Sequence, residues 1–216
     1  MTPLDPDRTL ALSYVPTRRR ASVAALWHLD AALGAVVSGG NEPMISRIKL
    51  AWWREALERL DHSPPPAEPT LEAAAAHLLP QGLSGAELSA MESGWAVLLN
   101  EDALSPEELH TYAAERGGAL FRLTARLLGV EASAEQAQAG QCWALADLAR
   151  HSGEPDAGAA LAAARDLARE EKWPAALRPL GMLAVLAVRD VAAPAPEPQG
   201  SPARMLRMLK HRITGC

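Results

Sequence analysis

Residues 18–38 read RRRASVAALWHLDAALGAVVS, and this stretch decides the class of fold. Alanine and leucine dominate it, and a composition poor in β-branched residues favours helix. Pro16-Thr17 before the stretch and Gly39-Gly40 after it are typical start and stop signals. We therefore predict one long helix from about Arg18 to Ser38, and the same composition continues through the rest of the chain.

Helix signals recur along the chain, whereas alternating strand patterns bounded by hairpin turns do not. Proline, serine or glycine marks the expected ends, and we predict helices over about 42–60, 70–79, 84–100, 106–128, 133–151, 156–172 and 179–191. The expected core face of the 42–60 helix comprises Ile45, Ile48, Trp52, Trp53, Ala56, Leu57 and Leu60. A proline-rich linker over 192–202 and a short basic C-terminal helix complete one all-α domain over 1–216.

Composition excludes several functional classes. With 216 residues and 49% hydrophobic side chains, the chain can bury a sizeable core, and disorder is not expected. A formal net charge of -5 gives no general affinity for nucleic acid. Cys142 and Cys216 do not make a disulfide framework, so a reducing compartment is expected. Neither a signal peptide nor an apolar run of about 18–20 residues is visible, so we expect a cytoplasmic protein.

Three stretches carry a family resemblance through their order and spacing. The first is YVPTRRR at 14–20 with ALWHL at 25–29, and the second is RIKLAWWRE at 47–55. The third joins MESGW at 91–95, the segment from Tyr112 to Gly118, and CWALADLAR at 142–150. Together they resemble the squalene/phytoene synthase family of head-to-head prenyltransferases over roughly residues 11 to 150. The resemblance implies a helical bundle of isoprenoid-synthase type with a central cavity.

The chemistry implied by the resemblance is the ionisation of an allylic diphosphate. Magnesium neutralises the departing phosphates, and carboxylates on two facing helices hold the metal. The first acidic motif aligns with residues 34–38, where this chain has GAVVS and no carboxylate. Asp30, one turn earlier, is a candidate displaced ligand or an ordinary polar contact. The second motif keeps Asp147 and Arg150, and His151 replaces its last acid.

Several other residues become candidates for the cavity or for diphosphate binding. The resemblance places Arg20, Lys49 and Tyr112 near the substrate, and Trp53 with the other tryptophans could line the cavity. The alternatives are a solvated basic cluster for Arg20, a stem lying along the core for Lys49, and plain core packing for the aromatic residues. Asp147 and His151 are separated by four residues, which suits either a transition-metal pair or an ordinary surface pair on a helix.

Two functional hypotheses follow from the altered motifs. The leading one is a non-catalytic family member that binds an isoprenoid or other lipid or assists assembly of a membrane complex. Gly34 and Ser38 in place of acids are similar to the degenerate branch that includes the mitochondrial assembly factor for respiratory complex I. The alternative is an active prenyltransferase with a rearranged site around Asp30 and Asp147. Only that alternative requires magnesium, and no other cofactor is expected.

The C-terminal segment suggests a third role. Basic and apolar side chains alternate from Arg204 to Ile213, a pattern that suits either an anionic membrane surface or docking on the domain itself. The membrane interpretation predicts a peripheral protein at the inner face of the membrane.

Overall fold

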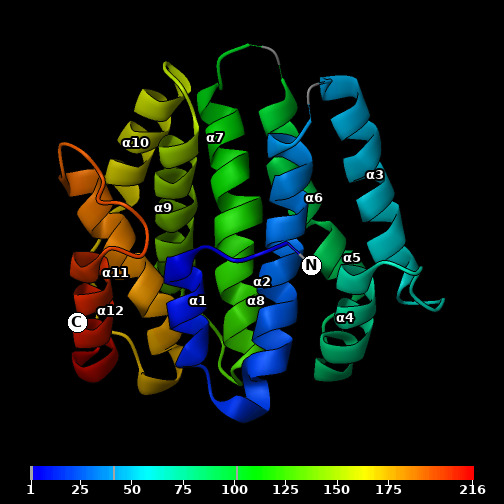
Figure 1. Ribbon diagram of the computed structural model, residues 1–216, viewed down its shortest axis with the longest axis horizontal. Helices are drawn as coiled ribbons and strands as arrows, with labels where there is room; N and C mark the ends of the chain where they lie inside the picture. The colour runs from blue at the N-terminus through cyan, green and yellow to red at the C-terminus, as the bar shows by residue number, and fades with distance from the viewer. Residues whose placement is uncertain (1, 41, 101) are drawn as a thin grey trace.

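The molecule is a bundle of helices that lie side by side along its long axis, as Figure 1 shows. This computed structural model describes residues 2–40, 42–100 and 102–216, and none of these residues forms a strand. The elements in chain order are α1 Pro6–Ser13, α2 Thr17–Ser38, α3 Pro43–Arg59, α4 Pro69–His77, η1 Leu79–Gln81, α5 Gly85–Ser89, α6 Met91–Ala96, η2 Val97–Leu99, α7 Pro106–Tyr112, η3 Ala113–Gly118, α8 Ala119–Leu127, α9 Ala134–His151, α10 Asp156–Leu167, η4 Ala175–Leu177, α11 Arg178–Ala192 and α12 Pro202–Thr214.

Helix α2 lies inside the bundle and buries a long run of its residues. Its Trp27 is fully buried and donates from Nε1 to Thr124 Oγ1 of α8 at 3.0 Å. By length and composition alone, α2 is the one described helix that is long and apolar enough to span a membrane. A core helix passes the same test, and the buried ion pairs of Asp30 place α2 in the core.

The segment α7–η3–α8 runs as one continuous rod between α2 and α9 in Figure 1. Its middle part, η3, is a π-helical turn, a local widening that is frequent at functional sites. The rod packs very closely on α9, because a Cβ on Gly117 would lie 2.2 Å from the carbonyl oxygen of Gly140. This close approach brings side chains of η3 and α9 together at the centre of the bundle.

Most predicted helices are confirmed, and their ends follow the local signals. Ser84, Ser105 and Ser133 each form a capping box, which satisfies backbone groups at the helix start. Two expectations were wrong in detail: the 84–100 segment is divided into α5, α6 and η2, and α10 ends at Leu167. Helix α1 was missed, although Asp5 caps it and Pro6 opens it.

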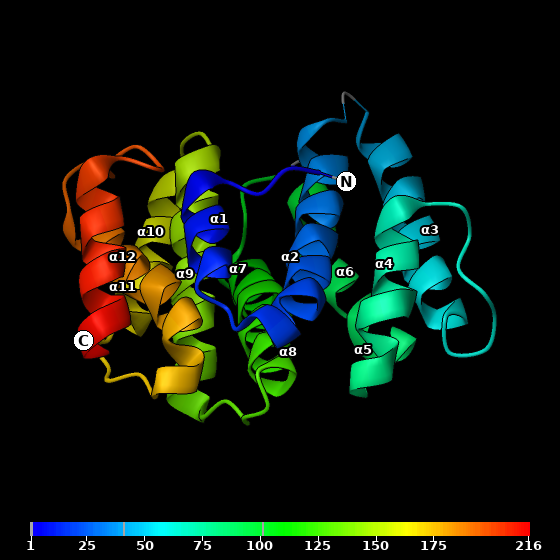
Figure 2. The same ribbon diagram turned by 60° about the horizontal axis from the view of Figure 1, so that its bottom comes forward.

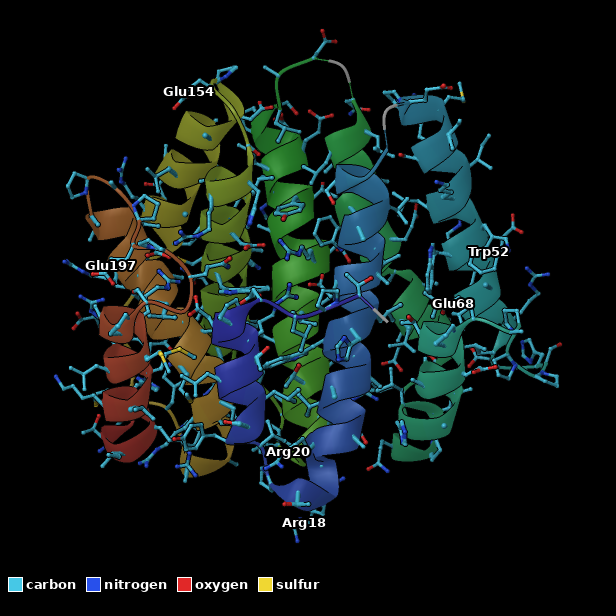
Figure 3. The ribbon with its side chains drawn as sticks, viewed as in Figure 1. Arg18, Arg20, Trp52, Glu68, Glu154 and Glu197 are labelled. Atoms are coloured by element: carbon cyan, nitrogen blue, oxygen red, sulfur yellow. The ribbon has the colours of Figure 1, made fainter. Side chains whose placement is uncertain are left out.

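The predicted core face of α3 is half wrong. Trp53, Ala56, Leu57 and Leu60 are buried, but Ile45, Ile48 and Trp52 are exposed, as is Met44. The reason is that α3 carries apolar residues on two opposite faces, and only one face packs on the bundle. Helix α3 lies at the outer edge in Figures 1 and 2, and Figure 3 shows Trp52 on its outer side. We call Met44, Ile45, Ile48 and Trp52 the outer row of α3.

The C-terminal helix α12 packs against α11 and α1, after a linker that contains no helix from 193 to 201. Its Arg204 is buried and pairs with Asp7 of α1 at 2.9 Å and with Asp190 of α11 at 2.6 Å. These contacts dock α12 on the domain, while Met205, Leu206 and Ile213 stay exposed. Both cysteines are free, with Cys142 buried and Cys216 exposed.

Candidate functional site

A cavity of about 660 Å³ opens at the centre of the bundle. Its wall combines apolar residues of α2 with polar residues of η3 and α9, and the chain before α1 contributes Thr2 to Asp5. Figure 1 shows this N-terminal segment crossing in front of α2 and the central rod. The Thr2 carbonyl lies 2.8 Å from Nδ1 of His28, a contact that holds the segment on α2. The cavity thus lies at the position expected for an isoprenoid-synthase bundle.

Asp30 of α2 is fully buried behind the cavity wall, and both of its carboxylate oxygens are hydrogen-bonded. Its Oδ1 accepts from Arg116 Nε at 3.1 Å and from Trp95 Nε1 at 3.2 Å. Its Oδ2 accepts from Arg8 Nη1 at 2.8 Å and from Arg116 Nη2 at 3.4 Å. Because these four contacts occupy its oxygens, Asp30 acts as an anchor for two arginines.

Arg116 of η3 is 1% exposed and lies between the carboxylates of α2 and α9. Besides its contacts with Asp30, it reaches Asp147 Oδ2 from Nη2 at 2.8 Å and donates to the Tyr112 hydroxyl. Its guanidinium also lies over the Trp95 ring, 4.1 Å from the centroid, a cation–π contact. Burial alone lowers the pKa of Arg116, but Asp30 and its other partners raise it well above the ordinary value. The side chain is therefore a fixed positive charge.

Asp147 of α9 lines the cavity and is the one partner of Arg116 that reaches solvent in part. Burial by itself raises the pKa of Asp147, but Arg116 and Arg8 outweigh burial, so the net pKa lies below the usual range. The carboxylate is ionised at neutral pH. His151, one turn on, lies 3.5 Å from Asp147 Oδ1 and is mostly exposed. Its Nδ1 is also 2.8 Å from the Asp147 carbonyl oxygen, so the ring packs back on its own helix.

The glycine at the first altered motif position has a steric role. A Cβ on Gly34 would lie 2.7 Å from Cη2 of Trp95, which is closer than real Cβ contacts. The Trp95 indole therefore lies directly on the backbone of α2 and leaves no room for a side chain there. The indole is held by the hydrogen bond to Asp30 and by an edge contact with Tyr112, whose ring centroid lies 5.7 Å away, a spacing typical of aromatic pairs.

The structure separates the candidate residues into those near the cavity and those far from it. Tyr112 and Asp147 line the cavity, and Asp30 lies directly behind it. Lys49 and Trp53 instead line a second hollow of about 450 Å³, which shares Thr2 and Ala35 with the first.

Two further candidates, Arg20 and Arg150, line neither of these hollows. Arg20 lies at the lower end of α2 in Figure 3, where it donates to the carbonyl groups of Ser13 and Val15 at 2.9 Å each. That guanidinium closes the turn between α1 and α2. Arg150 turns away toward the C-terminal half and pairs with Asp190 at 2.9 Å. In both cases nearby backbone or carboxylate oxygens bind the guanidinium.

The donor set does not fit magnesium. Magnesium needs several oxygen ligands in octahedral geometry, but Asp30 has its oxygens occupied and Asp147 is paired with Arg116. Within the part of the chain that the structure describes, no group of three or more His, Cys, Asp or Glu side chains is placed to hold a metal ion. The pair of Asp147 and His151 therefore has no third ligand among these residues.

An all-helical bundle with acidic residues from two facing helices beside a half-apolar cavity defines the isoprenoid-synthase class of fold. The family model described as squalene/phytoene synthase matches residues 2–187. This chain belongs to the squalene/phytoene synthase family. Among solved structures, it is similar to one titled as the crystal structure of a dehydrosqualene synthase in complex with ligand. That match has a TM-score of 0.69 at 12% identity and covers 96% of this chain and 90% of the other. No curated protein matches the sequence.

Sequence reasoning missed the two arginines and the tryptophan that complete the site. Arg116 lies within the Tyr112–Gly118 segment that carried the resemblance, but it was not considered as a site residue. Arg8 belongs to the helix that was not expected, and Trp95 was noted only among aromatic residues of the core or cavity. One signal was available: Arg116 stands directly before the glycine pair Gly117-Gly118, inside the segment that carried the resemblance.

Proposed function

We propose that this chain is a non-catalytic member of its family whose central cavity binds an isoprenoid or other lipid. The observation that carries the proposal is the position of Arg116, ion-paired with Asp30 and Asp147. In the family, carboxylates on two facing helices hold magnesium diphosphate. Here Arg116 and Arg8 pair with the remaining carboxylates, which makes those carboxylates poor ligands for a metal. The apolar part of the cavity wall is retained for a hydrocarbon chain.

The altered first motif supports the same conclusion. Trp95 packs on Gly34, so even a reintroduced aspartate at position 34 would clash with the indole. The Trp95 ring thus fills the space beside residue 34 that a motif carboxylate would need. Such packing is compatible with a cavity that no longer ionises a diphosphate. The rival hypothesis, an active prenyltransferase around Asp30 and Asp147, requires Arg116 to leave both carboxylates.

The deciding experiment is a direct assay of the purified chain with magnesium and farnesyl or geranylgeranyl diphosphate. We expect neither pyrophosphate release nor a condensed product, with an active family enzyme as the positive control. Pyrophosphate release above background that disappears in the Asp147→Asn variant would refute the proposal and support the prenyltransferase. Equal pyrophosphate release by the parent chain and the Asp147→Asn variant would indicate a contaminating enzyme. The assay would then be repeated on re-purified samples of both proteins.

A second candidate function, assistance in assembling a membrane complex, is favoured by the outer row of α3. Met44 is 64% and Ile48 63% exposed, and large apolar side chains gathered on one helix face mark interaction surfaces. In cells that lack the chain, we expect the Ile48→Ser, Trp52→Ser variant to fail to restore the complex on native gels. The matched control is Leu206→Ser on α12, which is exposed to a similar extent. Equal restoration by both variants would remove α3 from this role.

A further inference from the structure

The charged residues of the central cavity wall are unevenly balanced. Four aspartates line it, Asp5, Asp102, Asp147 and Asp156, against two arginines. Both arginines are already engaged by carboxylates: Arg8 by Asp5 and Asp30, and Arg116 by Asp30 and Asp147. The cavity therefore has an excess of negative charge. Among its described lining residues no arginine or lysine is left to receive an anion, and the histidine among them, His151, already contacts Asp147.

This balance matters for the headgroup of any ligand. A diphosphate placed here would face ionised carboxylates, and like charges at close range in a poorly solvated site repel strongly. It would also have to draw Arg116 away from two partners, one of which, Asp30, is fully buried. Leaving a buried carboxylate without its counterion is costly. The electrostatics thus oppose the headgroup on which the family's chemistry depends.

The rest of the wall suits a hydrocarbon chain. Leu4, Ala31, Ala35, Val37, Leu98 and Leu104 line it. The volume of about 660 Å³ lies within the range of roughly 300–1,000 Å³ that ligand pockets occupy. Among the polar lining residues, Asp147 has an ionised carboxylate that is partly open to solvent. A carboxylate can only accept hydrogen bonds, so it selects a headgroup that donates them.

We propose that the cavity binds a phosphate-free isoprenoid, or a similar linear lipid, whose hydroxyl or ammonium headgroup donates to Asp147, and that it discriminates against prenyl diphosphates. The inference rests on the proposed function, because it concerns the same cavity. It adds the class of ligand, which the loss of catalysis alone does not fix: a non-catalytic protein with free cations would still bind a diphosphate.

The test compares three probes that share one farnesyl chain: farnesol, farnesylamine and farnesyl diphosphate. Binding is measured by calorimetry at moderate salt without magnesium. We expect farnesol to bind at least about tenfold more tightly than the diphosphate, and farnesylamine at least as tightly as farnesol. Raising the salt concentration should lower the affinity for farnesylamine and raise the affinity for the diphosphate. Salt screens both the attraction of the ammonium and the repulsion of the diphosphate by the carboxylates. A diphosphate that binds as tightly as farnesol, or no binding of any probe, would overturn the inference.

A variant tests the role of Asp147. Asp147→Asn should lower the affinity for farnesylamine about tenfold or more and change the affinity for farnesol less. It should also reduce the difference in affinity between farnesol and the diphosphate. The matched control is Asp166→Asn, an exposed aspartate on α10 outside the cavity wall, which should change none of the three affinities. An unchanged amine affinity in folded Asp147→Asn would contradict the assigned contact. Failure of the proposed function is distinguishable, because it is recorded as pyrophosphate release and not as probe preference.

Discussion

Replacing Arg116 by methionine is the sharpest perturbation of the central cluster. Methionine keeps an unbranched stem of similar length but removes the charge that Asp30 and Asp147 share. Asp30 would keep Arg8 and Trp95 but remain fully buried, with half of its hydrogen bonds gone. Asp147 is 16% exposed and can partly rehydrate, so most of the cost comes from Asp30. Removing one partner of a buried ion pair costs about 3–5 kcal/mol, and we expect a loss in that range.

The assay is urea unfolding followed by far-UV circular dichroism at neutral pH. Asp30→Asn in the Arg116→Met background should recover part of the loss, with a coupling energy of roughly 2 kcal/mol between the two sites. The control is Arg122→Met on the exposed side of α8, expected to stay within about 0.5 kcal/mol of the parent. A loss below about 1 kcal/mol for Arg116→Met would refute the view that this guanidinium holds α2 and α9 together.

Three further predictions address packing, pH and the surface. Gly34→Ala should destabilise by about 1–3 kcal/mol in thermal unfolding, because its Cβ meets Trp95, and Trp95→Leu should relieve most of that loss. Burial and the neighbouring Arg178 lower the pKa of His211 to about 4. The His211 ring therefore binds a proton near pH 6.5 in the unfolded chain but not in the folded one, so the free energy of unfolding falls with decreasing pH. His211→Gln should remove roughly 2 kcal/mol of that fall between pH 7 and pH 5, measured by urea titrations. Ile48→Ser should cost less than about 0.5 kcal/mol and Leu50→Ala about 2–5, because only Leu50 is buried.

The course of the chain could be predicted where local signals decide it. Helix α9 begins after Ser133 with Gln136 three residues on, and ends at His151 as expected, because capping is a contact between near neighbours. The faces of α3 could not be predicted in this way. Ile48 and Leu50 are similarly apolar, so composition does not tell which of them is buried. The position of α3 at the edge of the bundle decides that Leu50 is buried and Ile48 exposed.

The candidate site shows the same limit at longer range. The resemblance brought attention to Asp30 and Asp147, but their shared partner lies 86 residues from Asp30 in sequence. No local pattern predicts such a pairing, and the π-helical turn that carries Arg116 departs from the regular helical spacing on which sequence arguments depend. The contacts of Arg20 were missed for the opposite reason: its partners Ser13 and Val15 are close in sequence, in a turn that was not anticipated.

The proposed function assigns Arg116 a structural role as well, as a replacement for the ions that the family uses. Carboxylates facing each other across a cavity repel, and in the family magnesium and diphosphate balance them only when bound. Two guanidinium groups held in the chain, those of Arg116 and Arg8, balance Asp30 and Asp147. The contact of Arg116 with Trp95 adds packing that a hydrated metal would not provide. The bundle should then be equally stable with or without these ligands. We expect magnesium, inorganic pyrophosphate or a chelator to leave the Tm unchanged, since a ligand that binds the folded state would raise it. A clear rise with magnesium and pyrophosphate together would show that the carboxylates still hold a metal and that Arg116 yields to it.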